Sequence, residues 1–307
     1  MINRGKEDKK TMVRDRISAI IFWLLAECKI TNPLPDEIFV KLLYQFGTGK
    51  KLNLENPRLF NEKIQWLKLY DREDEYTNLV DKYEVRDYVK KQIGEEHLIP
   101  LVGGPWNSFD EIDFSKLPNQ YVLKCTHDSG GVYICTDKEK CNKRKMKRKI
   151  EKSLKRNYFY LGREWPYKNV KPRIIAEKYM VDESGIELKD YKIFCFSGEP
   201  KLIQVDFNRF SNHQRNVYST NWEYLPVEIK YPTNSEHIIE KPKCLDEMLR
   251  IASVLSQGKK HVRVDLYCIG EKVYFGELTF HHGSGCEKIT PPEFEKTMGD
   301  WIEIKKS

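Results

Sequence analysis

Apolar and polar positions alternate with a helical period along the first part of the chain. In residues 36–46 and again in residues 60–69, apolar side chains recur at intervals close to 3.6 positions. Asn61 stands near the start of the second segment, where we expect it to cap a helix. The pattern therefore predicts a helical N-terminal region over residues 1–80.

From residue 96 onward, short apolar runs bounded by glycine and polar loops predict strands. The expected strands are 98–102, 121–125, one starting at Val132, 173–180, 190–196, 201–207, 261–268 and 273–280. The last four form two consecutive pairs with turn residues between them, which is typical of antiparallel hairpins. Residues 245–255 return to helical spacing. The chain is thus predicted to be α+β, with antiparallel sheets.

Residues 17–26, ISAIIFWLLA, are largely apolar and follow a basic stretch over residues 4–16. This segment is about half of the roughly twenty residues that span a bilayer. Glu27, Cys28 and Lys29 follow it, where a signal peptide would need small residues for cleavage. We expect a retained amphipathic helix, and the sequence leaves open whether it packs on the core or touches a membrane surface.

Composition narrows the class of protein. The 307 residues are 40% hydrophobic and 12% aromatic, which supports a folded core and excludes disordered or fibrous chains. The eight cysteines include no C-x-x-C pair, a pattern that suits a reducing cytosol and not a disulfide scaffold or zinc ribbon. We therefore expect a cytoplasmic protein, with the inner face of the membrane as its only candidate contact with lipid.

The net charge of +7 is a mild excess, and much of it gathers in one segment. Between Asp137 and Arg156, the run KEKCNKRKMKRKIEKSLKR predicts a basic helix. It could bind a polyanion or an acidic membrane, or it could simply be a solvated helix face. The run lacks interleaved aromatic residues and any known nucleic-acid motif, so we expect no nucleic-acid partner.

The terminal hairpin carries polar residues where strands favour apolar ones. Arg263 and Asp265 share one face of the first strand, and Glu277 and Thr279 share one face of the second. A three-residue turn over 270–272 would set Asp265 opposite Glu277. Two carboxylates about 4 Å apart repel by roughly 4 kcal/mol at an effective dielectric near 20, so the pair calls for a cation. That cation could be Mg²⁺, which prefers oxygen ligands. Alternatively, Arg263 pairs with both acids and the three residues form a structural triad.

Two further segments suggest a nucleotide. In YVLKCTHDSGGVYIC, residues 121–135, a strand delivers Lys124 and is followed by a glycine loop whose backbone amides could approach phosphate oxygens. An ordinary tight turn is the alternative. In RIIAEKYM, residues 173–180, an apolar strand ends in polar residues. Its apolar side chains could pack against a purine base, and its backbone groups could hydrogen-bond to the edge of that base.

In this order and spacing, the segments resemble the ATP-grasp superfamily, and within it the TupA-like branch associated with teichuronopeptide and capsular polysaccharide synthesis. The similar phrases are NEKIQWLKLYDR, DKYEVRDYV, VLKCTHDSGG, IIAEKYM, DYKIFCFSGEP, VRVDLY and VYFGELTFHHGSG. The resemblance implies two α+β lobes whose antiparallel sheets clamp ATP, preceded by the helical region. It implies a first lobe over residues 81–178, with the lysine strand and glycine loop, and a C-terminal lobe over residues 179–307, with the metal site.

The resemblance also implies roles for single residues. Those expected at the nucleotide are Lys82 or Arg86 on the phosphates, Lys124 on the α and β phosphates, Ser129, Gly130 and Gly131 as a lid, and Glu177, Lys178, Tyr179 and Met180 around adenine. Glu177 is also expected to fix Lys124. Asp265 and Glu277 correspond to Mg²⁺ ligands, and Thr279 stands where many members have asparagine.

The remaining implied roles concern the reacting groups. Lys192 would meet the γ-phosphate, unless it is an exposed strand lysine. The acceptor side would lie at Arg263, His281, His282, Gly283, Ser284 and Gly285. One histidine could serve as a base for the amine, or both could be solvated loop residues. Acceptor loops are expected over 158–168 and 208–218, where Trp165, Tyr167, Arg209 and Arg215 suit a sugar face and a carboxylate.

The implied chemistry uses ATP and Mg²⁺. A substrate carboxylate attacks the γ-phosphate to give an acyl phosphate and ADP, and an amine then forms an amide. The expected partners are a uronic-acid sugar or polymer precursor and an amine or amino acid. A glycosyltransferase is the main alternative, although the chain contains no D-x-D motif. A sugar kinase and a non-catalytic polymer-binding module are the others.

Overall fold

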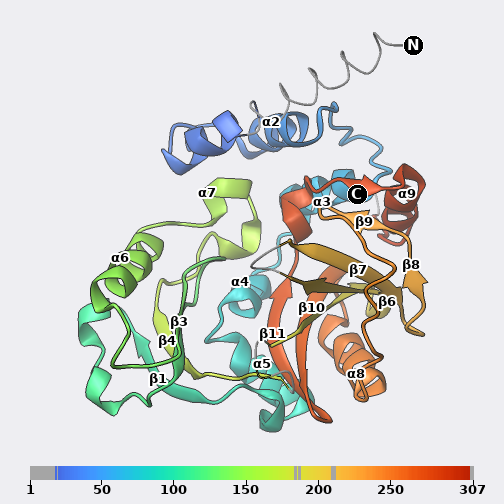
Figure 1. Ribbon diagram of the computed structural model, residues 1–307. Helices are drawn as coiled ribbons and strands as arrows, with labels where there is room; N and C mark the ends of the chain where they lie inside the picture. Colours follow the sequence, from blue (N-terminus) through green and yellow to red (C-terminus); the bar gives the residue numbers. More distant parts are fainter. Residues whose placement is uncertain (1–17, 19, 183–184, 186–187, 209–211, 305–307) are drawn as a thin grey trace.

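The computed structural model describes residues 18, 20–182, 185, 188–208 and 212–304. Two antiparallel sheets dominate them (Figure 1). The four-stranded sheet has the order β1-β4-β2-β3, and the six-stranded sheet has the order β11-β10-β5-β6-β7-β8. The α+β class with antiparallel sheets is as predicted.

The four-stranded sheet forms one lobe with α6 (Lys143–Leu154). Its strands are β1 (Leu101–Trp106), β2 (Tyr121–Cys125), β3 (Val132–Cys135) and β4 (Ile174–Lys178). Met146 and Ile150 of α6 are fully buried, and the helix packs on β2 and β3. Short helices η2 (Phe109–Glu111) and η3 (Phe114–Lys116) close the edge of this core. The lobe is therefore a sheet covered by one helix whose outer face is basic.

The six-stranded sheet is covered on both faces. Its strands are β5 (Asp190–Phe196), β6 (Glu199–Phe207), β7 (Gln214–Ser219), β8 (Tyr224–Leu225), β10 (His261–Ile269) and β11 (Lys272–Thr279). One core packs it against α4 (Glu75–Val80), α5 (Val85–Ile93) and α8 (Leu245–Ser256). Another packs it against α3 (Phe60–Tyr70), α9 (Pro292–Asp300) and the small β12-β9 sheet, formed by Ile289–Thr290 and Glu228–Ile229. Burial on both faces explains why β5 is buried along its whole length.

The N-terminal part is helical, as expected, over the described residues. Residues 20–27 form a helix that packs on α2 (Asp36–Thr48). Arg163, which follows α7 (Phe159–Gly162), holds this unit to the body. Its buried guanidinium donates to the carbonyls of Thr31, Asn32 and Leu34 and lies 3.1 Å from Asp36.

Two local expectations are wrong. Asn61 does not cap α3, which begins at Phe60; Glu62 accepts hydrogen bonds there from the backbone amides of Arg58 and Leu59. Asn61 instead lies buried inside the helix and donates to Glu295. The strand expected over 98–102 starts later and runs through Gly103 and Gly104, because these glycines let β1 pass close to β4. A Cβ at Gly104 would lie 2.8 Å from the Ile174 carbonyl oxygen.

The cysteines also differ from expectation. Cys135 and Cys141 form one disulfide, and Cys244 and Cys268 form another. Cys28, Cys125, Cys195 and Cys286 are free. The spacing of cysteines in the sequence did not predict these pairs, because both depend on how strands and helices meet in space.

Candidate active site

The β10–β11 hairpin places Asp265 directly opposite Glu277. The predicted reason for this register is wrong. The turn holds two residues, Gly270 and Glu271, and a bulge at Gly276 then shifts the pairing by one position. A Cβ at Gly276 would lie 2.9 Å from the Asp265 carbonyl oxygen, so glycine permits the bulge. The expected turn was one residue too long and the bulge was not expected. The two differences cancel, so the same two carboxylates face each other.

Arg263 binds both carboxylates of this pair. Its Nε and Nη2 atoms each donate to one oxygen of Asp265 at 2.6 Å, and Nη2 lies 3.5 Å from Glu277 Oε1. Nη2 also donates to the Thr279 hydroxyl at 3.1 Å. The side-chain arrangement is thus the ion-paired triad that the sequence offered as an alternative to a metal pair.

Burial and charge shift the pKa values of this triad in opposite directions. Burial acts to lower the pKa of Arg263, but the carboxylates, Asp265 foremost, outweigh it and raise that pKa above its ordinary value. Burial acts to raise the pKa of Asp265, while Arg263 and Lys192 outweigh it and hold that pKa below its usual range. Both groups are therefore charged at neutral pH.

Lys192 lies on β5, opposite Asp265, and is buried. The reading of Lys192 as an exposed strand lysine is therefore wrong. Its ammonium group pairs with Asp190 and lies 3.5 Å from Asp265 Oδ2 and 3.9 Å from Asp206 Oδ2. A lysine among three carboxylates is held in place more firmly than a surface lysine.

These ion pairs belong to a closed ring that runs across β5, β10, β6, β7 and the loop after β11. Each member contacts the next, in the order Lys192, Asp265, Arg263, His282, Glu287, Arg215, Asp206 and back to Lys192. Sequence reasoning missed Asp206 and Glu287 and placed Arg215 in a loop, whereas it lies in strand β7. The available signal was a buried-strand pattern, IQVDF, that carries a charged residue.

The two adjacent histidines are buried, so their reading as solvated loop residues is wrong. Arg263 Nη1 donates to Nδ1 of His282 at 2.6 Å, and Nε2 of His282 lies 3.0 Å from Glu287. Burial lowers the pKa of His282, and the neighbouring Glu287 acts in the opposite direction. Burial likewise holds the pKa of His281 well below its usual range. Nδ1 of His282 is occupied by Arg263 and Nε2 faces Glu287, so His282 is better placed to orient Arg263 than to accept a proton.

A left-handed turn follows the histidines in η5 (His282–Gly285). Gly283, Ser284 and Gly285 have φ values of 54°, 52° and 64°, and Ser284 adopts a conformation that suits glycine better. Helix α3 stabilises this turn from behind. Lys68 donates to the Ser284 carbonyl and hydroxyl at 2.8 Å, and Gln65 donates to the Gly285 carbonyl at 2.9 Å. The N-terminal helices thus support the expected acceptor loop directly.

The four-stranded sheet brings together a second group of predicted residues. Lys124 on β2 and Glu177 on β4 share a face of the sheet, and their side chains meet at 2.5 Å. Arg86 of α5 reaches the other oxygen of Glu177 at 3.8 Å. The contact that we expected between Glu177 and Lys124 is present. Of the two candidate basic residues, Arg86 joins this cluster.

Lys82 points elsewhere, toward the glycine loop. Its ammonium group donates to the Asp128 carbonyl at 2.6 Å. In the loop, Ser129 and Gly130 are exposed, whereas Gly131 is buried, and a Cβ there would lie 2.4 Å from the Ser153 hydroxyl. Gly130 has a φ of 112° and open space around its Cα. The loop is anchored at Gly131 and free of side-chain contacts at Gly130.

The residues expected around adenine lie at the end of β4. Lys178 is exposed, its amide donates to the Pro100 carbonyl at 2.9 Å, and Tyr179 and Met180 are half-buried in the following segment. Of the expected acceptor loops, 158–168 folds into α7 and η4 (Trp165–Tyr167), and residues 214–218 belong to β7. Trp165 lies against Arg72 and Lys168. Arg209 lies outside the described residues.

Tyr158 connects the two groups of residues. Burial raises the pKa of Tyr158 above its ordinary value; the nearby carboxylates of Glu164 and Glu277 add to this, and the Ser129 hydroxyl opposes it. Ser129 belongs to the glycine loop, and Glu277 belongs to the carboxylate pair. Parts of both groups therefore act on the same tyrosine, and β11, which carries Glu277, is an edge strand of the six-stranded sheet (Figure 1).

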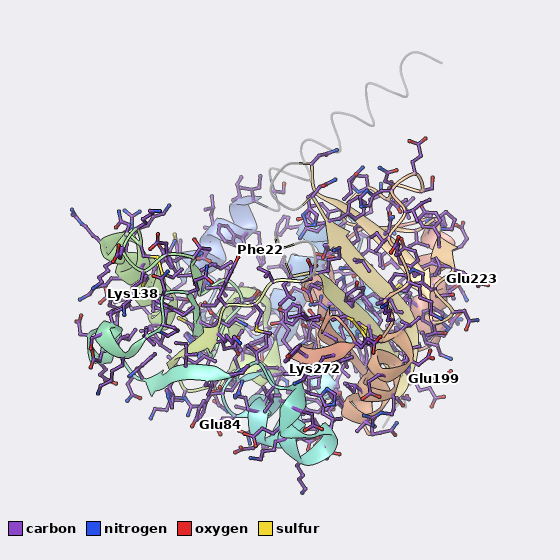
Figure 2. All side chains as sticks on the ribbon, turned by 60° about the horizontal axis from the view of Figure 1, so that its bottom comes forward. Phe22, Glu84, Lys138, Glu199, Glu223 and Lys272 are labelled. Atoms are coloured by element: carbon purple, nitrogen blue, oxygen red, sulfur yellow. A yellow bond between two sulfur atoms is a disulfide. The ribbon has the colours of Figure 1, made fainter. Side chains whose placement is uncertain are left out.

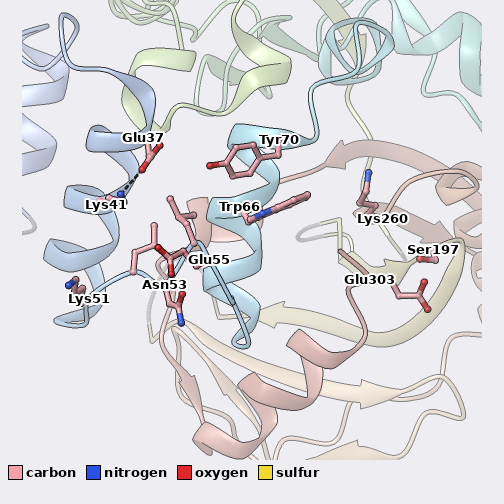
Figure 3. A pocket seen from close by; sticks show the side chains of 12 residues that line it. Glu37, Lys41, Lys51, Asn53, Glu55, Trp66, Tyr70, Ser197, Lys260 and Glu303 are labelled. Carbon is pink, nitrogen blue, oxygen red and sulfur yellow. Dashed lines mark hydrogen bonds and ion pairs between the residues drawn. The ribbon is translucent and has the colours of Figure 1, made fainter. Parts of the chain in front are cut away.

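A separate cleft of about 1290 Å³ contains none of the predicted site residues. Trp66 and Tyr70 of α3 line it together with Lys260, Ser197 and residues of α2 (Figure 3). Lys41 on α2 is paired with Glu37, as the dashed line shows. This cleft lies beside α3, and the ion pairs that carry the candidate chemistry lie elsewhere.

The model of the TupA-like ATP-grasp family matches residues 62–303. This match spans most of the chain and includes both sheets and α3. The chain belongs to the TupA-like ATP-grasp family. Its α+β architecture is accordingly the ATP-grasp fold, as the order of motifs predicted.

Solved structures of similar fold share little sequence with this TupA-like protein. D-alanine–D-alanine ligase from Helicobacter pylori is 14% identical, with a TM-score of 0.40 over 80% of this chain and 69% of that protein. The enzyme of the same name from Bacillus anthracis, in complex with ATP, is 14% identical, with a TM-score of 0.40 over 73% and 63%. N5-carboxyaminoimidazole ribonucleotide synthetase from Thermus thermophilus is 9% identical, with a TM-score of 0.37 over 66% and 45%. No curated protein matches the chain. Sequence identities and TM-scores this low say nothing about the activity of this chain.

The donor set of this TupA-like protein can be compared with what Mg²⁺ requires. No three His, Cys, Asp or Glu side chains in the described part of the chain form a metal cluster by themselves. Mg²⁺ is, however, commonly held by one or two carboxylates with phosphate and water oxygens completing its shell. Asp265 Oδ1 accepts a single hydrogen bond from Arg263 and keeps a second lone pair, and the Glu277 side chain is 39% exposed. The two carboxylates fit a Mg²⁺ ion that arrives with a nucleotide.

Proposed function

We propose that this protein is an ATP-dependent ligase that joins a carboxylate to an amine through an acyl phosphate. The carboxylate would belong to a uronic-acid sugar or polymer precursor, and the amine would be an amino acid. Family membership supports the reaction class. The choice of substrate rests on the resemblance of the motifs to the branch associated with teichuronopeptide and capsular polysaccharide synthesis. One structural observation supports the proposal: Tyr158 interacts both with Ser129 of the glycine loop and with Glu277 of the carboxylate pair.

The four-stranded sheet would bind the polyphosphate. Lys124 and Arg86 supply positive charge, and Glu177 holds Lys124 in position through its 2.5 Å contact. Ser129 and Gly130 of the glycine loop are exposed, and their backbone amides could donate to phosphate oxygens. Such preorganised donors act mainly by positioning and by neutralising the charge on the transferred group.

The six-stranded sheet would hold the reacting groups. Mg²⁺, held by Asp265 and Glu277, would neutralise charge on the phosphates. Lys192 would face the γ-phosphate, and Arg263 would orient Asp265 and attract the substrate carboxylate. The substrate oxygen forms a bond to the γ-phosphorus while the bond to the ADP oxygen breaks. The amine then attacks the acyl carbon, loses a proton and releases phosphate.

The first test is nucleotide binding. We expect isothermal titration calorimetry with Mg²⁺ to show ATP binding that Lys124→Ala weakens and that Lys116→Ala leaves unchanged. Lys116 is the control because its side chain is 83% exposed and lies in the same lobe. Absence of ATP binding, or an unchanged affinity in Lys124→Ala, would contradict the proposal.

The second test concerns substrate class. Mass spectrometry of ATP incubations with uronic-acid oligosaccharides and mixed amino acids should reveal ADP, phosphate and a condensation product. Transfer of phosphate alone to the oligosaccharide would indicate a kinase. UDP release from nucleotide sugars without consumption of ATP would indicate a glycosyltransferase and would overturn the ligase assignment.

A further inference from the structure

The helix of residues 20–27 is apolar around its whole circumference up to Glu27. One face packs on the protein: Phe22 and Ala26 are buried, and the Phe22 ring lies 5.2 Å from the rings of Phe39 and of Phe46. A helix that is apolar all round is normally buried on all sides. Here only one side is covered by the described residues.

The uncovered side consists of Ile20, Ile21, Trp23 and Leu24, which we name the apolar face. These side chains are between 49% and 58% exposed. At 3.6 residues per turn they span a continuous arc of about 160°. Scattered exposed apolar residues are normal, but a continuous arc with a tryptophan in it marks an interaction site.

A strongly basic surface adjoins this helix. Glu27, its last residue, pairs with Arg156 just beyond the end of α6 at 2.9 Å. Helix α6 carries seven lysine and arginine residues against one glutamate, a balance of +6. Six of them are exposed, and five of these lie on one side of the helix, which we name the basic face: Arg144, Lys145, Arg148, Lys149 and Lys152. Figure 2 labels Phe22 in the N-terminal helix and Lys138 in the lobe that carries α6.

We propose that the apolar face and the basic face together form a docking surface for an anionic phospholipid bilayer. No described helix has the length and apolar character to cross a membrane, so the chain would lie on the bilayer through this surface. Large apolar side chains with a tryptophan enter the boundary between headgroups and acyl chains, and neighbouring lysine and arginine side chains contact anionic headgroups. This assignment is independent of the proposed catalytic reaction.

Charge distinguishes a bilayer from a second copy of the chain. A twofold interface over the apolar face would bring two adjoining α6 helices of the same sign toward each other, and like charges across an interface oppose association. An anionic bilayer complements both features at once. Contact with an anionic bilayer also accounts for the excess of cations on α6, because these exposed cations do not belong to the candidate active site.

The test is co-sedimentation of the full chain with vesicles. We expect binding to vesicles made of equal parts phosphatidylglycerol and phosphatidylcholine, weakened by added salt, and little binding to phosphatidylcholine alone. Trp23→Ser with Leu24→Ser changes the apolar face, and Arg148→Glu with Lys152→Glu changes the basic face. Each pair should lower the partition coefficient about tenfold or more.

Control variants carry changes of the same kind on the other lobe. Ile238→Ser alters an apolar side chain that is 84% exposed in the other lobe, and Lys241→Glu with Lys243→Glu reverses two exposed charges there. We expect both controls to bind anionic vesicles like the wild type. Circular dichroism and thermal unfolding of every variant verify folding, and the basic-face variant, whose changes are both at exposed positions, keeps the test decisive if the apolar variant is unstable.

Three outcomes would overturn the proposal. The first is a wild-type chain that binds no vesicles, or that binds neutral and anionic vesicles equally. The second is binding that the control variants weaken as much as the face variants do. The third is a concentration-dependent dimer in analytical ultracentrifugation that Trp23→Ser with Leu24→Ser abolishes, in the absence of vesicle binding; that result would assign the apolar face to a second copy.

Discussion

The two sheets each present a lysine to the candidate active site, but they hold it in different ways. Lys124, on the four-stranded sheet, pairs with the buried Glu177 near Arg86, and the side chains of Lys124 and Arg86 are each 17% exposed. Lys192, on the six-stranded sheet, is one member of a buried ring that includes Asp265 and Arg263. The first arrangement has few partners and is open to a ligand. The Lys192 arrangement has many ionic partners, so it contributes to the local structure as well as to the chemistry.

This contrast predicts that the same kind of substitution affects different properties in the two sheets. In the ring, removing one charge leaves its partners buried without compensation, which costs folding free energy. In the Lys124 cluster, Arg86 remains beside Glu177 when the lysine is removed. Stability should therefore depend on the ring, and ligand affinity on the lysine cluster.

The largest expected effect is that of Asp265→Asn. The substitution leaves the buried Arg263 without its bidentate partner and should lower the free energy of unfolding by about 3–5 kcal/mol. Urea denaturation at neutral pH measures it. Glu277→Gln is the matched control for stability: its side chain is 39% exposed, so the loss should stay within about 1 kcal/mol. Equal losses for the two variants would contradict the role of burial within the ring.

Lys124→Met should have the reverse effect. We expect the affinity for ATP to fall roughly ten- to a hundredfold, because one phosphate contact is lost, equivalent to about 1.4–2.8 kcal/mol. The free energy of unfolding should change by less than about 1 kcal/mol, because Arg86 remains beside Glu177 and balances its charge. Calorimetric titration and urea denaturation of the same variant give both numbers. A variant that loses stability but keeps its affinity would show that Lys124 is a structural residue.

A buried histidine makes the six-stranded sheet sensitive to pH. His261, at the start of β10, is packed among Phe60, Phe194 and Phe196, and burial lowers its pKa to about 3. The unfolded chain therefore binds a proton more readily below about pH 6.5 than the folded chain does, and stability falls as the pH drops from there toward 3. The slope from this group is about 1.4 kcal/mol per pH unit.

The measurement compares wild type with His261→Gln in urea between pH 7 and pH 5. We expect the variant to be less stable at pH 7 and to lose less stability on acidification. If both proteins lose the same amount, the contribution of His261 is absent.

The sequence predicted well those features that local pattern controls. The hairpins at 190–207 and 261–279, helix α8 and the order of the motifs all depend on periodicity and turn residues within short segments. The facing of Asp265 and Glu277 was also predicted, although the real cause is a two-residue turn with a bulge at Gly276. Alternation along a strand tells which residues share a face, but it does not reveal a bulge.

The ring of ion pairs was not predictable in the same way. Asp206, Arg215 and Glu287 come from separate elements, and only the packing of β6 and β7 beside β5 brings them to Lys192 and Arg263. The role of α3 was missed for the same reason. Lys68 looks like an ordinary helix lysine in sequence, yet it is fully buried behind the turn at Ser284.

The smallest expected effect concerns the glycine loop, which belongs to the lobe of the four-stranded sheet. Gly130→Ala adds a Cβ where no heavy atom lies within 4 Å, so the substitution introduces no clash. Its cost should come from the φ of 112°, which an L-residue adopts with strain of about 1 kcal/mol. A loop that must approach phosphate with this backbone conformation should then bind ATP more weakly by a comparable amount. If Gly130→Ala leaves both the stability and the calorimetric affinity unchanged, the loop does not keep this conformation, and the phosphate contacts must come from Lys124 and Arg86 alone.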